Sequence, residues 1–244
     1  GKYYFNDFER AGGMKALMKT LLPLLNSDCK TVNGKTLKEN YSDAPVYDTD
    51  VIHTLDAPVS SDGGIAVLKG NLAPDGAILK TAAVPKNMMY FEGRAKVFSE
   101  VDDAITALRH GEIKAGDAVV INYLGPKGRF GTTAFAFQKE VAGMDIYDKV
   151  AIITDGRFSG GTSGLSIGYA APEAAIKGPL AVVENGDKII IDVEKRKMDI
   201  DLSDEEIAER LKKVDWRLRE EKFKPFLRLF ARNVSSTAKG AAWL

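Results

Sequence analysis

Residues 149–175 read KVAIITDGRFSGGTSGLSIGYAAPEAA, and this segment is the most informative part of the sequence for fold and function. Its first part, Val150–Ile153, is a short apolar run, which is the pattern of a buried strand. The loop that follows, residues 155–164, holds one acid, one arginine, two serines and four glycines. Glycine lets the backbone approach a ligand closely, and ligand sites in sheet proteins lie beyond strand ends. The segment therefore predicts a strand that leads into a functional loop.

Within this loop, Ser159 has the strongest case for a chemical role. Gly160 and Gly161 follow it, so no side chain crowds its hydroxyl. Arg157 carries the planar guanidinium that binds a carboxylate through two parallel hydrogen bonds. Asp155, at the strand end, is expected to orient either Arg157 or the loop. The competing interpretation is that Asp155 and the serines only cap turns, and local chemistry leaves both open.

A second glycine-rich turn, Gly125-Pro126-Lys127-Gly128, also follows an apolar run. Neither turn has the glycine spacing of a P-loop or of the dinucleotide-binding fingerprint. The first loop also lacks the glycine that a G-x-S-x-G nucleophile elbow places two residues before its serine. These nucleotide-binding and hydrolase motifs are therefore excluded.

The composition is that of a neutral globular protein. Its 244 residues include 34 Lys+Arg and 34 Asp+Glu, and 45% are hydrophobic. A net charge of zero gives no electrostatic attraction to nucleic acid or to an anionic membrane. No apolar run approaches the roughly 20 residues that span a bilayer, and the first residues show no signal-peptide pattern. We therefore expect a cytoplasmic protein that binds neither nucleic acid nor a membrane.

Two histidines and one cysteine restrict the chemistry further. His110 ends a predicted helix, where a cation complements the helix dipole, so a Ser-His-Asp triad is not expected. His53 lies among aspartates, a pattern of either a metal cluster or, more simply, a solvated acidic loop. Cys29 alone excludes a disulfide framework and a zinc site made mainly of thiolates.

Strand and helix patterns alternate along the chain and predict one β-rich α/β domain of barrel-like form. Strands are predicted at residues 63–70, 77–84, 95–99, 117–125, 150–155 and 196–202, with a turn at 73–76 and a hairpin over 180–193 that turns at Asn185-Gly186. Helices are predicted at residues 12–25, 36–41, 99–111, 172–178, 203–214 and from residue 226 onward. Ser99 is expected to cap one of them, and Ser203 with Glu206 to form the capping box of another.

The segment TDGRFSGGTSG, residues 154–164, resembles the second signature of the dihydroxy-acid dehydratase and phosphogluconate dehydratase family. The form TDGRFSGGT is more similar to dihydroxy-acid dehydratases than to phosphogluconate or sugar-acid dehydratases. The likeness continues in family order through GNLAPDGAILKTA (70–82), GEIKAGDAVVINYLGPKG (111–128), APEAAIKGPLAVVENGDKIIIDV (171–193), LSDEEIAERL (202–211) and VSSTAKGA (234–241).

This resemblance implies a fold and a reaction. The fold is a swivelling β-barrel with flanking helices, of the aconitase-like C-terminal domain type. The enzymes are hydro-lyases that convert a 2,3-dihydroxy or sugar acid into a 2-keto acid, as in branched-chain amino acid biosynthesis. An iron–sulfur cluster acts as Lewis acid, and a magnesium ion holds the substrate. Ser159 is then the implied catalytic base, and the implied substrate-binding residues are Arg157, Gly160, Gly161, Thr162 and Asp155.

The chain departs from the family pattern in three ways. It corresponds to a single C-terminal domain over residues 1–244, so the iron–sulfur cluster and magnesium are expected only with an N-terminal cluster-binding domain absent from it. The family's magnesium-binding glutamate is replaced by Thr133 or Ala134, so no metal ligand is assigned here, and Glu140 lies too far along to substitute. The family's histidine before the PEA motif is replaced by Tyr169.

Two functions follow from these observations. The first is the C-terminal domain of a hydro-lyase, which contributes Ser159 to a composite site and is inactive as an isolated chain. The second is a divergent, non-catalytic binding or assembly domain that keeps the fold. The expected partners are the N-terminal dehydratase domain or a second copy in a homodimer, and a small hydroxy acid. Because half of the site would lie elsewhere, Ser159 and Arg157 are expected to be exposed at the rim of the domain.

Overall fold

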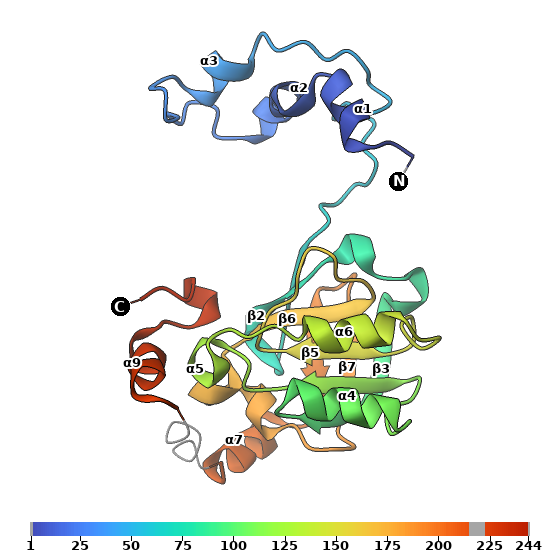
Figure 1. Cartoon of the computed structure of the whole chain (residues 1–244), viewed down its shortest axis with the longest axis vertical. Coiled ribbons are helices and arrows are strands. Elements are labelled where there is room, and N and C mark those ends of the chain that lie inside the picture. The colour runs from blue at the N-terminus through green and yellow to red at the C-terminus, as the bar shows by residue number, and fades with distance from the viewer. Residues whose placement is uncertain (1, 215–222, 244) are drawn as a thin grey trace. The chain divides into compact units, whose positions relative to one another are not determined.

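The computed structural model describes residues 2–214 and 223–243. The chain folds as two compact units, Gly1–Asp62 and Gly63–Leu244 (Figure 1). This differs from the single domain expected over residues 1–244, because the first segment closes a small core of its own around Ala11, Ala16 and Ile52.

The first unit is helical. It contains α1 (Phe5–Arg10), α2 (Gly13–Leu21) and α3 (Leu37–Tyr41), and these confirm the helices expected at residues 12–25 and 36–41. A capping box opens α3, in which Glu39 N donates to Thr36 Oγ1 at 3.1 Å and Thr36 N donates to the Glu39 carboxylate at 2.6 Å. The sequence pattern was sufficient here because the capping signal is local.

The described residues of the second unit form a closed barrel of eight strands, which confirms the expected fold class. Around the barrel the order is β1 (Ala66–Gly70), β2 (Ala73–Leu79), β6 (Leu165–Ala171), β5 (Ala151–Thr154), β4 (Asp117–Ile121), β3 (Tyr90–Phe98), β7 (Lys188–Asp192) and β8 (Lys197–Ile200). The run from β3 through β4 and β5 to β6 is parallel, and a single parallel bridge between Lys69 and Lys197 closes the barrel.

The parallel strands bring the two glycine-rich loops together. β4 and β5 are neighbours, in register from Ala118–Ala151 to Ile121–Thr154. Parallel neighbours end on the same side of a sheet, so the loops that leave them start next to each other. One loop contains Gly125 and the short helix α5 (Pro126–Arg129), and the other begins at Gly156.

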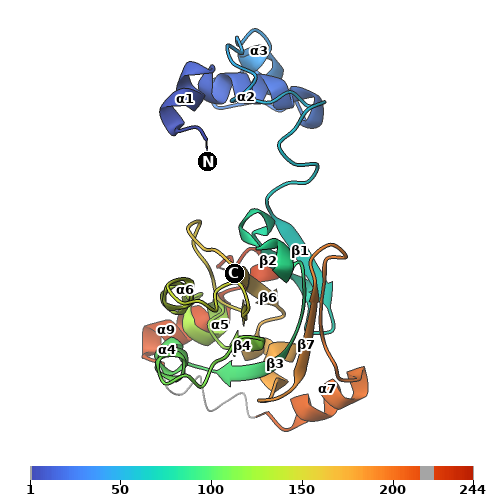
Figure 2. The same ribbon diagram turned by 90° about the vertical axis from the view of Figure 1, so that its right-hand side faces the viewer.

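Two helices, α4 (Val101–Arg109) and α6 (Phe135–Ala142), lie side by side on one side of the barrel (Figures 1 and 2). Phe137 of α6 packs with Ile152 of β5 in a core outside the barrel, whereas Leu79 belongs to the core inside it. A strand buried on both faces reads as a continuous apolar run, which explains why β4 and β5 lack alternation in the sequence.

Two predicted turns are wrong. Residues 73–76 open β2, and the turn lies at Asn71–Leu72, because the Asn71 side chain donates to Ile200 O at 2.9 Å and accepts from Ile200 N at 2.8 Å. The hairpin expected over residues 180–193 does not form. Asn185 instead accepts from Val97 N at 2.7 Å, and the hairpin of this region joins β7 to β8.

Other elements differ in extent or were not predicted. β6 and α6 were missed, and PEAAIKG forms only the 3-10 turn Ala174–Ile176. Ser99 does not cap α4, because the helix begins at Val101 and its N-cap residue is Glu100; the Ser99 hydroxyl donates to Asn122 Oδ1 at 2.8 Å.

The chain ends with α7 (Asp204–Lys212), α9 (Pro225–Asn233) and the 3-10 turn Thr237–Lys239. α7 begins with the expected capping box of Ser203 and Glu206. Leu244, the end of the predicted tail, lies outside the described residues. Within residues 2–214 and 223–243, no helix combines the length and apolar character needed to cross a membrane.

Candidate active site

Asp155 ties together the segments that carry the candidate site. Its side chain is 0% exposed, and its carboxylate accepts four backbone hydrogen bonds. Oδ1 accepts from Leu124 N (2.7 Å) and Gly125 N (3.2 Å), and Oδ2 accepts from Tyr123 N (3.1 Å) and Ala174 N (3.0 Å). Burial raises the pKa of Asp155 to about 6, against the lowering effect of these four donors. Asp155 therefore orients the loops through their backbone, which fits both the orienting role and the turn-capping interpretation, and its carboxylate is not exposed to a substrate.

Arg157 joins the two glycine-rich loops. Its N–H donates to Thr132 O (3.1 Å), and its carbonyl accepts from Ala134 N (3.0 Å) and from Thr133 Oγ1 (3.0 Å). Its Nε donates to Gly131 O at 2.5 Å. The side chain is exposed, as expected, and its terminal nitrogens have no hydrogen-bond partner among the described residues. These nitrogens are therefore available to a ligand carboxylate.

Ser159 lies at the exposed tip of its loop, as expected. Its carbonyl accepts from Thr162 N at 3.1 Å, which closes a turn over residues 159–162. A Cβ at Gly160 would meet open space, and one at Gly161 would meet only Ser159 Oγ, at 3.8 Å. In the part of the chain that the structure describes, no group hydrogen-bonds the Ser159 hydroxyl. The two glycines thus leave this hydroxyl uncrowded.

Contacts from outside hold the loop on either side of this tip. Lys80 Nζ donates to Gly160 O at 2.6 Å. Gln138 of α6 donates through Nε2 to both the carbonyl and the hydroxyl of Ser163, at 3.1 Å each. Thr162, expected to bind substrate, is instead buried, and its hydroxyl lacks a partner among the residues described. The exposed polar groups at this loop are therefore the Ser159 hydroxyl, the Arg157 guanidinium and the Lys80 ammonium.

Tyr169 lines a pocket of about 330 Å³ next to this loop. Its N–H donates to Gly156 O at 2.8 Å, and its φ of 57° is a left-handed conformation that is costly for a residue with a side chain. The pocket is bounded by Val67, Asp75, Gly76, Ile78, Tyr169, Ala171, Thr237 and Ala238. Tyr169, which was expected to stand in place of a histidine, therefore faces a cavity rather than the core.

Glu173 brings the C-terminal segment to the same place. The residue is 1% exposed, and its Oε1 accepts from Thr237 N at 2.5 Å. Its Cγ packs so closely on Gly125 that a Cβ there would lie 2.7 Å away. From the same loop, Lys127 Nζ donates to Ala231 O at 3.0 Å, near the end of α9. The segment VSSTAKGA thus forms a third wall beside the two loops.

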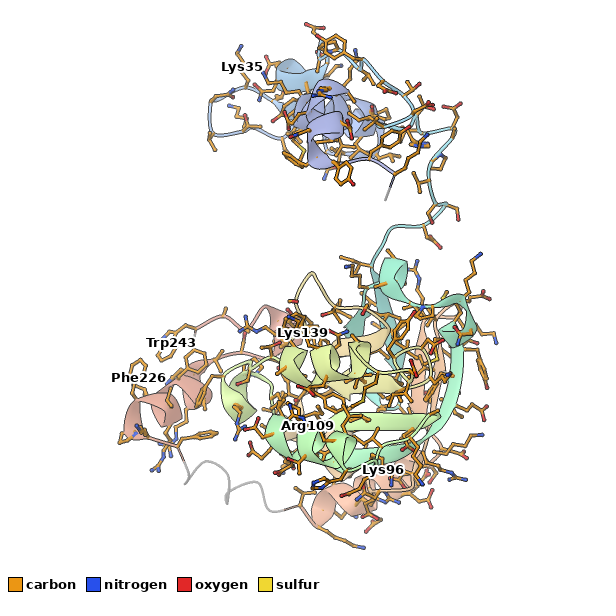
Figure 3. All side chains as sticks on the ribbon, turned by 45° about the vertical axis from the view of Figure 1, so that its right-hand side comes forward. Lys35, Lys96, Arg109, Lys139, Phe226 and Trp243 are labelled. Carbon is orange, nitrogen blue, oxygen red and sulfur yellow. The ribbon has the colours of Figure 1, made fainter. Side chains whose placement is uncertain are left out.

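The residues of this site do not fit magnesium or an iron–sulfur cluster by themselves. No group of three His, Cys, Asp or Glu side chains that could hold a metal occurs within residues 2–214 and 223–243. Thr133 and Ala134 bring no carboxylate to the expected glutamate position. Glu140 pairs with Arg109, labelled in Figure 3, through bonds of 2.8 and 3.2 Å, and this guanidinium lowers the pKa of Glu140. Cys29 is exposed in the first unit.

Sequence reasoning missed Lys80, Gln138 and Glu173 as residues that shape the site. Lys80 follows the end of β2, but the predicted strand 77–84 placed it inside a strand, and Glu173 follows β6, which was not predicted, so the rule that sites lie beyond strand ends did not identify them. Gln138 lies on a helix whose weak apolar pattern gave no signal.

Comparisons with known proteins relate this chain to one family. Residues 50–241 match the family model "Dihydroxy-acid/6-phosphogluconate dehydratase C-terminal", and residues 1–40 match the corresponding N-terminal model. The chain is 49% identical to a dihydroxy-acid dehydratase of Agathobacter rectalis over 99% of its own length and 44% of that protein. It is 46% identical to the protein of that name from Aquifex aeolicus, over 98% of the chain and 43% of the relative. The chain thus spans less than half the length of the curated relatives it matches.

Proposed function

The chain belongs to the dihydroxy-acid/6-phosphogluconate dehydratase family and contains its C-terminal domain, and on that premise we propose that it supplies one side of a hydro-lyase active site. The substrate class is a 2,3-dihydroxy or sugar acid, and the product is a 2-keto acid. The observation that carries the proposal is the exposed Ser159 hydroxyl, followed by two glycines that leave it uncrowded, in the same loop as Arg157, whose terminal guanidinium nitrogens have no hydrogen-bond partner among the described residues.

In this reaction Ser159 Oγ takes the proton from C2 of the substrate. The electron pair of that C–H bond forms the C2=C3 double bond, and the C3–O bond breaks. The hydroxide that leaves takes the proton from Ser159 and becomes water. The enol then loses the proton of its C2 hydroxyl, takes up a proton at C3 and becomes the keto acid. A neutral serine hydroxyl is a very weak base, so the species that removes this proton is the alkoxide, which nearby cationic groups stabilise.

Arg157 has the geometry to bind the substrate carboxylate. Its Nε is anchored to Gly131 O, so the guanidinium plane is held while its terminal nitrogens face outward. A planar fork held in this way matches a carboxylate through two parallel hydrogen bonds. Binding the carboxylate here would bring C2 of the substrate to the same loop as Ser159.

A partner is part of the proposal. Because the donors at this site do not fit a metal or cluster, an iron–sulfur cluster and magnesium would be held by polypeptide outside the described residues, of the kind found in the family's N-terminal domain. Apolar side chains on the C-terminal segment, Phe226 at 72% exposed and Trp243 at 54%, offer a surface to such a partner or to a second copy (Figure 3).

Co-expression of this chain with a family N-terminal domain, followed by an assay for keto acid, tests the proposal. Ser159→Ala is expected to lower turnover by about 10²–10⁴-fold, the range for loss of a general base. Ser163→Ala is the matched control in the same loop, because Gln138 still bonds the Ser163 carbonyl. Turnover that survives in Ser159→Ala would remove the serine from the reaction.

The second candidate is a non-catalytic binding or assembly domain. It is favoured by Thr133, Ala134 and Tyr169, which stand where the family resemblance places a metal-binding glutamate and a histidine. The same co-expression decides between the two, because stable association without turnover by the unmodified pair supports assembly alone.

A further inference from the structure

The tip of the serine loop has little to hold it in place. A Cβ at Gly160 would meet open space, and the Gly161 position touches only the serine itself. Glycine loses more conformational freedom on folding than any other residue. Two consecutive glycines next to Ser159 would therefore let its hydroxyl sample many positions unless an external contact restrains the tip.

Lys80 supplies that contact. In the described part of the chain, the bond from Lys80 Nζ to Gly160 O, at 2.6 Å, is the one hydrogen bond that reaches residues 159–161 from outside the loop. Further external bonds attach at the flanks: those of Arg157 to residues 131–134, that of Gln138 to Ser163, and that of Gly164 N to Ala83 O (3.0 Å). The flanks are thus fixed to residues 131–134, to α6 and to the segment after β2, while the tip depends on one cationic donor.

The backbone behind Lys80 makes it a firm anchor. Lys80 directly follows β2, and Leu79 of β2 pairs with Ile167 of β6, the strand to which the loop returns. The next residue, Thr81, donates its hydroxyl to Gly63 O at 3.2 Å. The lysine therefore reaches the tip from a backbone that is itself part of the barrel wall.

We propose that Lys80 is the positioning residue of the site: its ammonium holds the Gly160 carbonyl, fixes the tip turn, and so places the Ser159 hydroxyl. The ammonium also adds positive charge one residue from the serine, and a nearby cation favours an alkoxide over a neutral hydroxyl. This role in the reaction rests on the proposed function, whereas the restraint of the tip does not.

The restraint is measured on this chain by amide hydrogen exchange. The reporter is the Thr162 amide, whose bond to Ser159 O closes the tip turn, and the internal control is the Gly164 amide, bonded to Ala83 O. Lys80→Met is expected to speed exchange at Thr162 by about tenfold, as for loss of a charge-assisted hydrogen bond, with Gly164 unchanged. Lys80→Arg keeps a cationic donor and should restore slow exchange. Lys86→Met, at an exposed lysine after the same strand, is the matched control.

The catalytic part is measured in the complex with an N-terminal domain. Lys80→Met should lower kcat with little change in KM, and Lys80→Arg should recover most of it. Equal Thr162 exchange in the unmodified chain and Lys80→Met, or Lys80→Arg exchanging as fast as Lys80→Met, would overturn the proposal. A complex without turnover would refute the proposed function alone, because the exchange result is independent of it.

Discussion

The buried carboxylate of Asp155 should make the stability of the second unit depend on pH with an unusual sign. Burial raises its pKa in the folded chain to about 6, from an ordinary value of 3.8. Between these two pH values the folded state binds a proton that the unfolded state does not. The contribution of Asp155 to stability is therefore fully present below pH 3.8 and is lost as the pH rises through about 6.

The size of the contribution of Asp155 to stability follows from the same two pKa values. The full difference between 3.8 and about 6 corresponds to about 3 kcal/mol. Only part of this difference appears in the pH range from 8 to 5, where the free energy of unfolding should rise by about 1 kcal/mol as the pH falls. The amide in Asp155→Asn cannot titrate and loses this gain. It also turns its NH₂ toward backbone N–H donors, so the variant should be about 2–4 kcal/mol less stable at pH 8.

Urea unfolding followed by circular dichroism at pH 8 and pH 5, for the unmodified chain and for Asp155→Asn, isolates this effect from other carboxylates. The unmodified chain should gain about 1 kcal/mol relative to the variant on going to pH 5. Asp192→Asn is the control of opposite sign, because Lys195 lowers the pKa of Asp192 and its stabilising effect is lost as the pH falls. If the unmodified chain loses stability relative to Asp155→Asn at pH 5, the four N–H donors outweigh burial and the reasoning is refuted.

Two further predictions concern packing and cofactors. Gly125→Ala should lower the free energy of unfolding by about 1–3 kcal/mol, because the new Cβ would lie 2.7 Å from Glu173 Cγ. Gly160→Ala should be neutral or slightly stabilising, because its Cβ would meet open space, and thermal unfolding of both variants checks the contrast. The isolated chain, with Cys29 as its one cysteine, should bind no iron–sulfur cluster after anaerobic reconstitution with iron and sulfide. A stable visible absorption band that Cys29→Ser leaves unchanged, together with turnover, would contradict this.

The sequence was most informative where one residue type or one local spacing decides the structure. The apolar runs of β4 and β5 predicted buried strands, and the Ser203–Glu206 pair predicted the start of α7. The glycines after Ser159 predicted an uncrowded hydroxyl, which the structure confirms. In each case the physical cause acts within a few residues of its effect.

Long-range choices could not be predicted in this way. Val97 N donates a hydrogen bond to the side chain of Asn185, 88 residues away in the sequence, and the hairpin expected to turn at Asn185 does not form. Asp155 was expected near a ligand, but its four amide donors come from a preceding loop and from Ala174, which meet only when the parallel strands are adjacent. The tertiary partner, rather than local propensity, determined the role in both cases.

The contrast between Gly125 and Gly160 separates the two functions proposed for the domain. Gly125 is required by the fold, because the Glu173 side chain occupies the space of any Cβ. Gly160 is not: its position is open, and an alanine there would restrict the unfolded chain and raise stability. A domain kept only for assembly gains nothing from a flexible exposed tip that then needs Lys80 to hold it. A site in which a substrate must approach Ser159 closely gains from such a tip, because the open Gly160 position leaves room for the substrate while Lys80 holds the turn. These features therefore favour catalysis over assembly.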